Sequence, residues 1–380
     1  MLKAESKNKL KMVVTGGGTG GHLFPAIAVA EALLQQNAEN RVLFIGTGRQ
    51  LDNLALANRP FATATLKCPA IKGKNLFGGL LALLKLPFSL MAAIRLIKDF
   101  QADLVFAAGG YVSGPVGLAA WLLKIPVLIH EQNSVPGLTN RLLGHLARRV
   151  FVSLPGSEHY FPAGKTVLSG NPIRSELLAA SHAAARPHEK TTLLVLGGSQ
   201  GAHRLNLLML EAAARIGQQL RNWPGGFEII HQTGGQDEQL ARETYARLGL
   251  VAQVAPFIQA MAAAYNQADL VIARAGATTL AELLIFKKAA ILVPYPYAAD
   301  NHQAKNADHL VKNGGARMFY EAELTGPKLG AELIGLLTDP QARQEMAQKN
   351  GQLARPEATE TILNGCLEVV TTGRRLKVED

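Results

Sequence analysis

The chain has 380 residues, of which 48% are hydrophobic and 18% are charged. This composition excludes collagen-like, low-complexity and disordered classes, and the length predicts about two domains. A formal net charge of +10 favours anionic partners such as nucleic acid, phosphorylated substrates or acidic lipid.

Short apolar runs alternate with helical stretches along most of the chain. The N-terminal segment is charged and has no apolar core after it, so we predict no signal peptide. The apolar runs predict buried strands at residues 13–15, 42–45, 104–107, 127–129, 193–196, 228–230, 270–272 and 290–293. Apolar strands between helices predict an α/β fold with parallel sheets covered on both faces.

A polar stretch at residues 183–190 interrupts this alternation. On each side of it a strand is followed by a glycine-rich turn and a helix, at residues 14–22 and again at 196–202. We therefore predict two Rossmann-like domains, over residues 1–172 and 173–356. A cleft between two such domains would face the carboxyl ends of both sheets, where ligands bind in open α/β folds.

The first glycine-rich turn satisfies the pattern G-x-G-x-x-G at Gly16, Gly18 and Gly21. The helix that starts near His22 would present free amide groups and a positive dipole end to phosphate. A dinucleotide site also needs an acidic residue after the second strand, but residues 45–49 contain none. The sequence therefore does not favour an NAD site, and only an arginine in this segment supports an NADP site. The alternative to a binding site is a tight turn without a ligand.

Polar residues also follow several other strands. Ser199 in the second glycine-rich turn could donate to a diphosphate or cap the helix. Tyr111 and Ser113 follow the strand at 104–107 and suit a sugar or phosphate, or belong to a plain loop. The run His130-Glu131-Gln132-Asn133 is costly to bury unless it is hydrogen-bonded, so a structural network is the alternative to a site.

Two later loops carry similar side chains. Thr278 and Thr279 could cap a helix or meet phosphate. Glu282 lies four residues beyond Thr278 on the same helix face and suits the vicinal hydroxyls of a ribose, unless it is a surface residue. Gln303 and Asn306 are three residues apart and suit sugar hydroxyls.

Taken together, these clusters resemble the MurG family of UDP-N-acetylglucosamine transferases, which complete the disaccharide of the lipid-linked peptidoglycan precursor. The resemblance covers about residues 13–364 and rests on the order and spacing of residues 16–22, 109–115, 130–133, 170–174, 197–202, 277–282 and 303–306. It implies the GT-B fold, with the donor bound mainly by the second domain and the acceptor by the first. A final helix, at about residues 357–380, would pack back on the first domain.

The resemblance also implies binding residues. The expected donor contacts are Arg174, Ser199, Ile258, Ala277, Thr278, Thr279, Leu280, Ala281, Glu282 and Gln303. Glu282 would hold the uridine ribose, and Ile258 would meet uracil through its backbone. Residues expected to close over the donor sugar or acceptor are Thr19, Gly20, Gly21 and Asn133, and those expected near the acceptor diphosphate are Gly18, Tyr111, Ser113 and His130. The family pattern often has Gln where this chain has His302.

The implied reaction is inverting: the muramoyl 4-hydroxyl of lipid I attacks the anomeric carbon of the donor sugar as UDP leaves, and lipid II is formed. It needs a base and stabilisation of the departing diphosphate. We favour His22 as the base, because imidazole titrates near neutrality, and Glu131 is the second candidate. No Asp-x-Asp pattern follows a strand, so we expect no metal and no cofactor; helix N-termini, Ser199 and Arg174 would stabilise the diphosphate.

The implied acceptor is a polyprenyl diphosphate lipid, so the enzyme must reach a membrane. No apolar run reaches the roughly 18 residues that would predict a transmembrane helix. Residues 76–97 instead suit an anionic membrane surface through Leu76, Phe77, Leu80 and Leu84, with lysines nearby at positions 67, 72, 74 and 85. A buried helix is the alternative.

The expected location is the cytoplasmic face of a bacterial membrane, with other cell-wall synthesis enzymes as candidate partners. Cys68 and Cys366 match no disulfide framework or zinc spacing, which agrees with a reducing compartment. One rival function is a UDP-N-acetylglucosamine 2-epimerase, which needs no lipid acceptor. The other is a basic nucleic-acid-binding protein, but no basic-aromatic recognition motif occurs, so nucleic acid is not expected.

Overall fold

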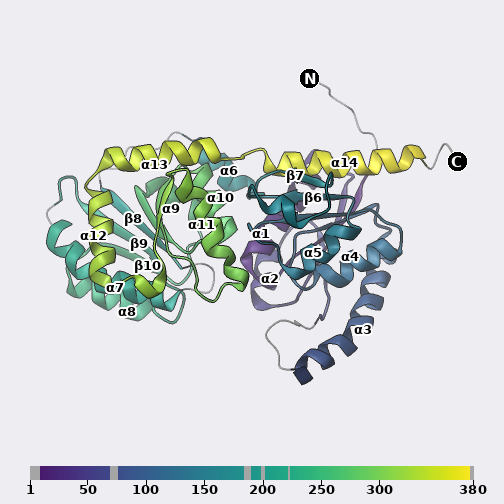
Figure 1. Cartoon of the computed structure of the whole chain (residues 1–380), viewed down its shortest axis with the longest axis horizontal. Coiled ribbons are helices and arrows are strands. Elements are labelled where there is room, and N and C mark those ends of the chain that lie inside the picture. Colours follow the sequence, from purple (N-terminus) through teal and green to yellow (C-terminus); the bar gives the residue numbers. More distant parts are fainter. Residues whose placement is uncertain (1–8, 69–75, 184–189, 198–201, 221–222, 377–380) are drawn as a thin grey trace. The chain divides into compact units, whose positions relative to one another are not determined.

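The chain folds into two compact units. The computed structural model describes residues 9–68, 76–183, 190–197, 202–220 and 223–376, without the side chains of residues 51, 76–85 and 373–376. The N-terminal unit comprises Met1–Arg174 and Pro356–Asp380, and the C-terminal unit comprises Ser175–Arg355. Each unit contains a parallel sheet with helices around it, which confirms the predicted α/β, Rossmann-like fold (Figure 1).

The N-terminal unit is built on a seven-stranded parallel sheet in the order β3-β2-β1-β4-β5-β6-β7. Its strands are β1 (Lys11–Thr15), β2 (Arg41–Gly46), β3 (Ala62–Thr65), β4 (Leu104–Ala107), β5 (Val127–Glu131), β6 (Arg149–Val152) and β7 (Thr166–Leu168). The strand order reverses between β1 and β4. Ligands bind beyond the carboxyl ends of the strands at such a switch point, so the loops after β1 and β4 are placed to form a site.

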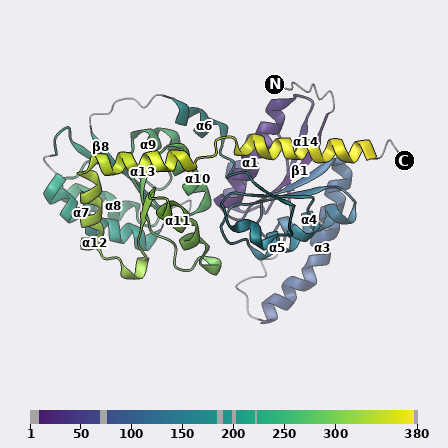
Figure 2. The same ribbon diagram turned by 45° about the horizontal axis from the view of Figure 1, so that its top comes forward.

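Helices cover both faces of this sheet (Figure 2). They are α1 (Gly20–Gln36), α2 (Gln50–Leu56), α3 (Leu76–Phe100), α4 (Ser113–Leu122), α5 (Leu138–Leu146) and α14 (Ala358–Leu376), with a short 3-10 helix at Ser157–Tyr160. Successive residues of β1 serve different cores. Val13 packs with residues of α3, α4 and α5, whereas Met12 and Val14 pack with α1 and α14. This alternation follows from the two-residue repeat of a strand.

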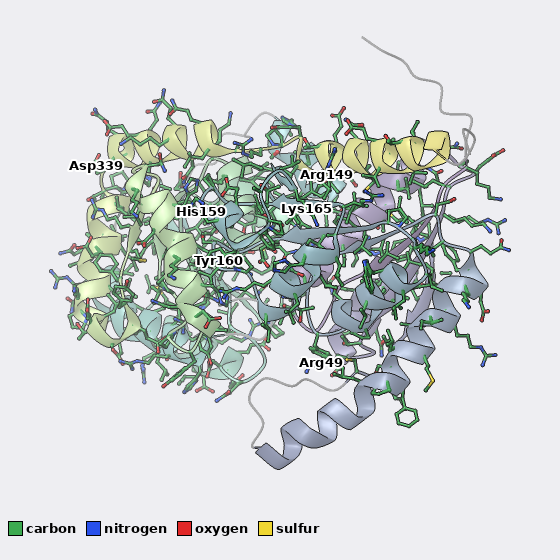
Figure 3. All side chains as sticks on the ribbon, turned by 45° about the vertical axis from the view of Figure 1, so that its right-hand side comes forward. Arg49, Arg149, His159, Tyr160, Lys165 and Asp339 are labelled. Carbon is green, nitrogen blue, oxygen red and sulfur yellow. The ribbon has the colours of Figure 1, made fainter. Side chains whose placement is uncertain are left out.

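The final helix α14 packs against α1 in the N-terminal unit, although the whole C-terminal unit precedes it in sequence. Ile362 and Cys366 are buried in the core that contains α1. Gly365 allows Phe151 to approach, because a Cβ at this position would lie 2.6 Å from the Phe151 ring. Arg149 lies beside the helix (Figure 3) and donates to Glu368 at 2.7 Å. The end of the chain is therefore part of the N-terminal unit.

The C-terminal unit repeats the same plan with a six-stranded parallel sheet in the order β10-β9-β8-β11-β12-β13. Its strands are β8 (Thr191–Leu196), β9 (Phe227–Gln232), β10 (Ala252–Ala255), β11 (Leu270–Ala273), β12 (Ala289–Leu292) and β13 (Ala316–Met318). Its helices are α6 (Ser175–His182), α7 (His203–Leu220), α8 (Glu238–Arg247), α9 (Met261–Gln267), α10 (Ala277–Ile285), α11 (His302–Lys312), α12 (Gly326–Leu337) and α13 (Pro340–Leu353). The switch point here lies between β8 and β11.

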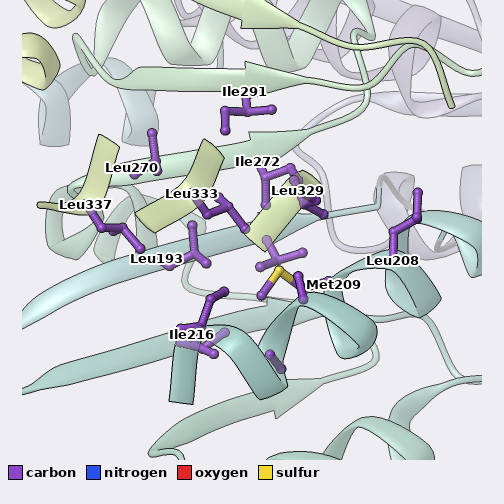
Figure 4. Close-up of a cluster of buried hydrophobic side chains, with 14 of the residues drawn as sticks. Leu193, Leu208, Met209, Ile216, Leu270, Ile272, Ile291, Leu329, Leu333 and Leu337 are labelled. Carbon is purple, nitrogen blue, oxygen red and sulfur yellow. The ribbon is translucent and has the colours of Figure 1, made fainter. Parts of the chain in front are cut away.

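One face of this sheet carries a large apolar core (Figure 4). Helices α7 and α12 pack against each other and against the sheet. The core side chains include Leu193, Leu208, Met209, Ile216, Leu270, Ile272, Ile291, Leu329, Leu333 and Leu337. Burial at this density makes the sheet a rigid support for the loops at its edge.

Among the described residues, no helix is long and apolar enough to cross a bilayer. The first half of α3 extends away from the body of the N-terminal unit (Figure 1). Leu76, Phe77, Leu80 and Leu84 lie in this half, and their side chains are outside the described part of the structure.

Candidate active site

The first glycine-rich turn connects β1 to α1 and is held from two sides. Gly18 has φ +84°, and a Cβ here would lie 3.2 Å from the Tyr111 ring. The buried carboxylate of Asp52 accepts from the Gly18 backbone amide at 3.3 Å and from that of Thr47 at 2.9 Å. No described side chain caps α1 at Thr19. Thr19, Gly20 and Gly21 therefore open a helix whose first amides are available to an anion.

His22 lies in the first turn of α1 and points its Nδ1 at the loops after β4 and β5. Nδ1 is 3.1 Å from the carbonyl oxygen of Ala108 and 2.8 Å from Oε1 of Gln132. Gln132 also contacts Nδ1 of His130 at 3.0 Å through its Nε2. Gln132 thus links His22 to the polar run after β5. No role of its own was predicted for this glutamine from the sequence.

His130 is fully buried at the end of β5. Its Nε2 is 3.1 Å from the carbonyl oxygen of Gly170 and 3.0 Å from Oγ of Ser153. Burial lowers the pKa of His130 to about 4, because the apolar surroundings disfavour the charged ring. With its nitrogens engaged by protein groups, His130 is part of the polar network behind His22.

Glu131 is also buried, with 1% of its surface exposed. One carboxylate oxygen accepts from the backbone amide of Asn133 at 2.9 Å, and the other accepts from Nδ2 of Asn140 at 2.9 Å. Burial raises the pKa of Glu131, and the hydrogen bond from Asn133 and the charge of His22 oppose that rise. Glu131 therefore anchors the loop that carries Gln132 and Asn133.

Two more of the expected acceptor residues lie beside the turn. The guanidinium of Arg49 lies 5.3 Å from the centroid of the Tyr111 ring and donates to the carbonyl oxygen of Gly18 at 3.2 Å. Ser113 is buried, and its hydroxyl donates to the carbonyl oxygen of Gly109 at 2.7 Å. The structure thus brings Gly18 and Tyr111 together with a cation, whereas the Ser113 hydroxyl braces its own loop.

The segment after β7 supplies Arg174 and a buried amide. The Arg174 guanidinium lies 4.9 Å from the centroid of the Phe24 ring. Asn171 is 5% exposed, and neither side-chain polar atom has a hydrogen-bond partner among the described residues. A buried amide without partners is costly, so this position is suited to receive a polar group.

In the C-terminal unit, α10 follows β11 through Gly276, and no described side chain caps it. Oγ1 of Thr278 is buried and has no hydrogen-bond partner among the described residues. Glu282 accepts from the Tyr265 hydroxyl at 2.9 Å and is 9% exposed. Of the neighbouring expected contacts, Ala277 and Leu280 are buried, whereas Thr279 and Ala281 are partly exposed. Helix α10 thus combines open backbone amides, a spare hydroxyl and an oriented carboxylate.

The remaining donor residues are spread over three loops. The backbone amide of Ile258 donates to Oε1 of the buried Gln232 at 3.0 Å. Oε1 of Gln303 accepts from the backbone amide of Tyr295 at 2.9 Å, which leaves its NH₂ group to donate elsewhere. His302 contacts the carbonyl oxygen of Ala299 through its Nδ1. Ser199 lies outside the described residues.

Sequence reasoning did not assign roles to Gln132, Asn140, Tyr265 and Gln232. Each is a polar side chain that contacts an expected site residue across the fold. Among the described residues, no group of three or more His, Cys, Asp or Glu side chains is arranged to hold a metal ion.

Comparisons with known proteins identify the family to which the chain belongs. Family models for the N-terminal and C-terminal domains of glycosyltransferase family 28 match residues 12–152 and 192–362. A protein of Desulfotalea psychrophila named UDP-N-acetylglucosamine–N-acetylmuramyl-(pentapeptide) pyrophosphoryl-undecaprenol N-acetylglucosamine transferase is 46% identical over 96% of this chain and 98% of its own length. The chain belongs to this transferase family. A protein of the same name from Syntrophus aciditrophicus is 44% identical over 95% of this chain and 99% of its own length.

Solved structures place the transferase family in the same fold. The crystal structure of Acinetobacter baumannii MurG matches with a TM-score of 0.74 and 34% identity, over 94% of this chain and 99% of that chain. The resemblance to the MurG family is therefore confirmed. A putative UDP-N-acetylglucosamine 2-epimerase from Listeria monocytogenes matches with a TM-score of 0.68 at 13% identity over 94% of this chain and 95% of that chain, which shows a shared fold alone.

Proposed function

We propose that this chain transfers N-acetylglucosamine from UDP-N-acetylglucosamine to the muramoyl 4-hydroxyl of undecaprenyl-diphospho-muramoyl-pentapeptide, so that lipid I becomes lipid II. The observation that carries the proposal is the near-complete alignment with transferases of that name, at 46% and 44% identity. The epimerase alternative has the support of a shared fold alone. The proposal of a nucleic-acid-binding protein depends on the positive net charge alone. Binding to an anionic lipid surface would account for that charge equally well.

The base in this reaction is His22. Its Nδ1 is held by the oxygens of Ala108 and Gln132, so the opposite nitrogen, Nε2, takes the proton of the attacking hydroxyl. The hydroxyl oxygen then bonds to the anomeric carbon as the bond from that carbon to the diphosphate breaks. Glu131 is less suited to this role because both of its oxygens accept hydrogen bonds from asparagines of the same unit.

Helix N-termini stabilise the charge that leaves with UDP. The open first turn of α10 provides backbone amides, and the buried Thr278 hydroxyl beside them has no described partner. Glu282, oriented by Tyr265, accepts from the ribose hydroxyls. Arg174 adds a positive charge, and Gln303 donates through its NH₂ group, because its Oε1 already accepts from Tyr295. The α1 turn, with Gly18 and Tyr111, receives the acceptor diphosphate.

A lipid-linked acceptor requires contact with a membrane surface. Described apolar side chains are exposed on three neighbouring helices: Phe88 and Met91 on α3, Trp121 and Leu122 on α4, and Leu138 and Leu142 on α5. Helix α4 packs against both α3 and α5. Phe88 is 69% exposed and Leu138 is 70% exposed, and apolar side chains that gather on adjacent elements mark interaction surfaces. Helix α3 also carries Leu76, Phe77, Leu80 and Leu84 in its sequence, so the membrane-binding surface that we propose comprises all three helices.

This surface would associate with anionic lipid at the cytoplasmic face of the bacterial membrane, where nucleotide sugars are available. Lys98 on α3, Lys124 after α4 and Arg141 on α5 contribute positive charge to the same helices. The product is a precursor of the cell wall, so the activity would serve cell shape and division alongside other cell-wall synthesis enzymes.

The membrane proposal is tested with vesicles that contain phosphatidylglycerol. Replacing Phe88 and Met91 together by Glu should abolish co-sedimentation while UDP binding persists, because both changes insert charge into an apolar surface. The matched control is Leu240→Glu, at an exposed leucine of α8 in the C-terminal unit. Unchanged co-sedimentation of the double variant would contradict the proposed surface.

The activity is tested by following labelled N-acetylglucosamine from its UDP form onto lipid I in detergent, with and without EDTA. The expected result is labelled lipid II under both conditions. Conversion of the donor to its 2-epimer, without labelled lipid, would establish the epimerase instead.

A further inference from the structure

Gln132 lies between two histidines of the N-terminal unit, and its amide can take one orientation. Its Nε2 is 2.7 Å from the carbonyl oxygen of Ala108 and 3.0 Å from Nδ1 of His130, while its Oε1 is 2.8 Å from Nδ1 of His22. Turning the amide over would press Oε1 against the Ala108 oxygen, with no proton between two acceptors. Nε2 therefore donates both of its protons, and Oε1 accepts.

The His130 ring fixes one end of this chain of hydrogen bonds. Its Nε2 faces the carbonyl oxygen of Gly170, which can only accept, so Nε2 carries the ring proton. Its Nδ1 is then a lone pair that accepts from Gln132. Because burial lowers the pKa of His130 to about 4, the ring is neutral and keeps this lone pair at physiological pH.

The other end of the chain is His22. Its Nδ1 faces two oxygen acceptors, from Ala108 and from Gln132. Neither oxygen can donate, so Nδ1 must carry the proton, and the lone pair of the neutral ring is on Nε2. No described residue forms a hydrogen bond with Nε2, which leaves it available to a substrate hydroxyl.

We propose that Gln132 is a positioning residue that holds His22 in the Nδ1–H tautomer, so that Nε2 is the atom that takes the acceptor's proton. This inference rests on the proposed function. As the proton arrives at Nε2, the ring becomes a cation, and the oxygens of Gln132 and Ala108 stabilise its charge through the Nδ1–H group. The electron pair of the broken donor bond leaves with UDP. Gln132 acts through His22 rather than on the substrate.

Two further groups on β5 respond to the charge of His22. Burial keeps His130 neutral, and a positive charge on His22 lowers the pKa of His130 further. The same positive charge lowers the pKa of Glu131, against the rise caused by burial. His130 and Glu131 must therefore remain unchanged in any variant that tests Gln132, so only the Gln132 side chain is substituted.

The first test reads the tautomer directly in the full-length wild-type chain. Histidines are labelled with ¹⁵N, long-range ¹H–¹⁵N correlations are recorded at neutral pH, and His22→Asn identifies the His22 signals. The expected result is a protonated Nδ1 and an unprotonated Nε2. The opposite tautomer, or a rapid mixture of both, would overturn the proposal. The spectrum needs no substrate, so its failure is distinguishable from a wild-type chain that makes no lipid II.

The second test compares Gln132→Met and Gln132→Glu with Asn40→Leu. Asn40 is another buried amide of the N-terminal unit and bonds backbone atoms of Leu10 and Leu33. We expect Gln132→Met to lower kcat about 10- to 100-fold, a part of what a positioned base contributes, with KM for the donor changed less than about twofold. Gln132→Glu should move the acid limb of kcat/KM to higher pH, because a carboxylate at Nδ1 favours the charged ring. Asn40→Leu should change neither parameter.

A Gln132→Met chain with wild-type kcat and an unchanged pH profile would contradict the positioning role. So would an Asn40→Leu chain that loses kcat to the same extent, because the loss would then follow from general destabilisation. Thermal unfolding and UDP binding establish that each variant is folded before its kinetics are compared.

Discussion

Each unit has a histidine near the start of the helix that follows its central strand, but the two histidines have different hydrogen-bond partners. In the N-terminal unit, β1 ends at Thr15 and His22 follows seven residues later (22 − 15). In the C-terminal unit, β8 ends at Leu196 and His203 also follows seven residues later (203 − 196). Nδ1 of His22 faces two neutral oxygens, whereas Nδ1 of His203 lies 2.7 Å from a carboxylate oxygen of Asp237.

This difference shows how one fold position can serve two different roles. Two neutral acceptors fix the tautomer of His22 and leave Nε2 to the substrate, as proposed above. The contact of His203 with Asp237 instead ties the start of α7 to the residue that precedes α8. We therefore propose a proton acceptor at this position of the N-terminal unit and a structural contact at the same position of the C-terminal unit.

Behind each histidine lies a second, buried histidine that is kept neutral. Burial lowers the pKa of His130 to about 4 and that of His231 to about 3. His231 contacts the Tyr245 hydroxyl at 2.8 Å and Oδ1 of Asn206 at 3.1 Å, and Asn206 donates to Asp237. The two networks differ in the group that meets the first histidine: the amide of Gln132 in one unit and the carboxylate of Asp237 in the other.

The largest expected effect is the difference in turnover between variants of His22 and of His203. His22→Ala should lower turnover about 10²- to 10⁴-fold, because the base is lost. His203→Ala should lower it less than about tenfold, because the His203 side chain is exposed and its contact with Asp237 lies at the surface. Transfer of labelled sugar to lipid I measures both. Equal losses in the two variants, or near-normal turnover in His22→Ala, would contradict the division of roles.

Acid should weaken the C-terminal unit more than the N-terminal unit. A buried histidine binds its proton more readily in the unfolded chain, so its contribution to stability is present above pH 6.5 and is lost as pH falls toward the folded pKa. Between pH 6.5 and pH 4 the loss is about 3 kcal/mol for each of His130 and His231. In the C-terminal unit, burial also lowers the pKa of His309, which adds to the loss.

Glu131 opposes this loss in the N-terminal unit. Because its pKa is raised in the folded state, its contribution to stability grows as pH falls through that pKa toward the unfolded value. Hydrogen exchange of the full-length chain, corrected for the intrinsic rate at each pH, resolves the two units separately. Greater loss of protection in the N-terminal unit at pH 5 would contradict the prediction.

A smaller effect is expected from the residue that orients Glu282. Tyr265→Phe removes the hydroxyl that donates to Glu282 at 2.9 Å within a buried site. Loss of one donor to a buried carboxylate costs about 1–3 kcal/mol of folding free energy. Because Glu282 also loses the group that orients it, KM for UDP-N-acetylglucosamine should rise about fivefold, which corresponds to about 1 kcal/mol of binding free energy. Because Tyr265 acts on donor binding, kcat should change little. Donor titration calorimetry checks the affinity directly, and an unchanged KM with a lowered kcat would exclude this role.

The central strands were predictable because they are buried on both faces and therefore read as apolar runs. β3, β7 and β10 were missed because they are edge strands or are partly exposed, so their sequences lack such runs. β13 has three residues, too few to form a recognisable pattern. β6 has four residues and is largely buried, but a charged pair precedes its apolar part, so it was not recognised as a strand.

The site was predictable as a set of loops but not as a set of contacts. The polar run after β5 was recognised because four polar residues rarely follow a buried strand. Its link to His22 depends on α1 and the loop after β5 meeting across β4, which no local pattern encodes. Tyr265 and Glu282 are likewise brought together by the packing of α9 and α10.

The smallest expected effect concerns the spare hydroxyl of α10. Thr278→Val removes an Oγ1 that is buried and has no described hydrogen-bond partner, so the free energy of unfolding should stay within about 0.5 kcal/mol of wild type or rise slightly. If the hydroxyl meets the donor diphosphate, the same change should weaken UDP binding by about 1 kcal/mol, or roughly fivefold. Thr278→Ser keeps the hydroxyl and should retain the affinity. Calorimetry of the three chains decides the matter: a Val variant that binds UDP as tightly as the Ser variant would remove Thr278 from the donor site, and a clear loss of stability would mean that the hydroxyl has a structural partner.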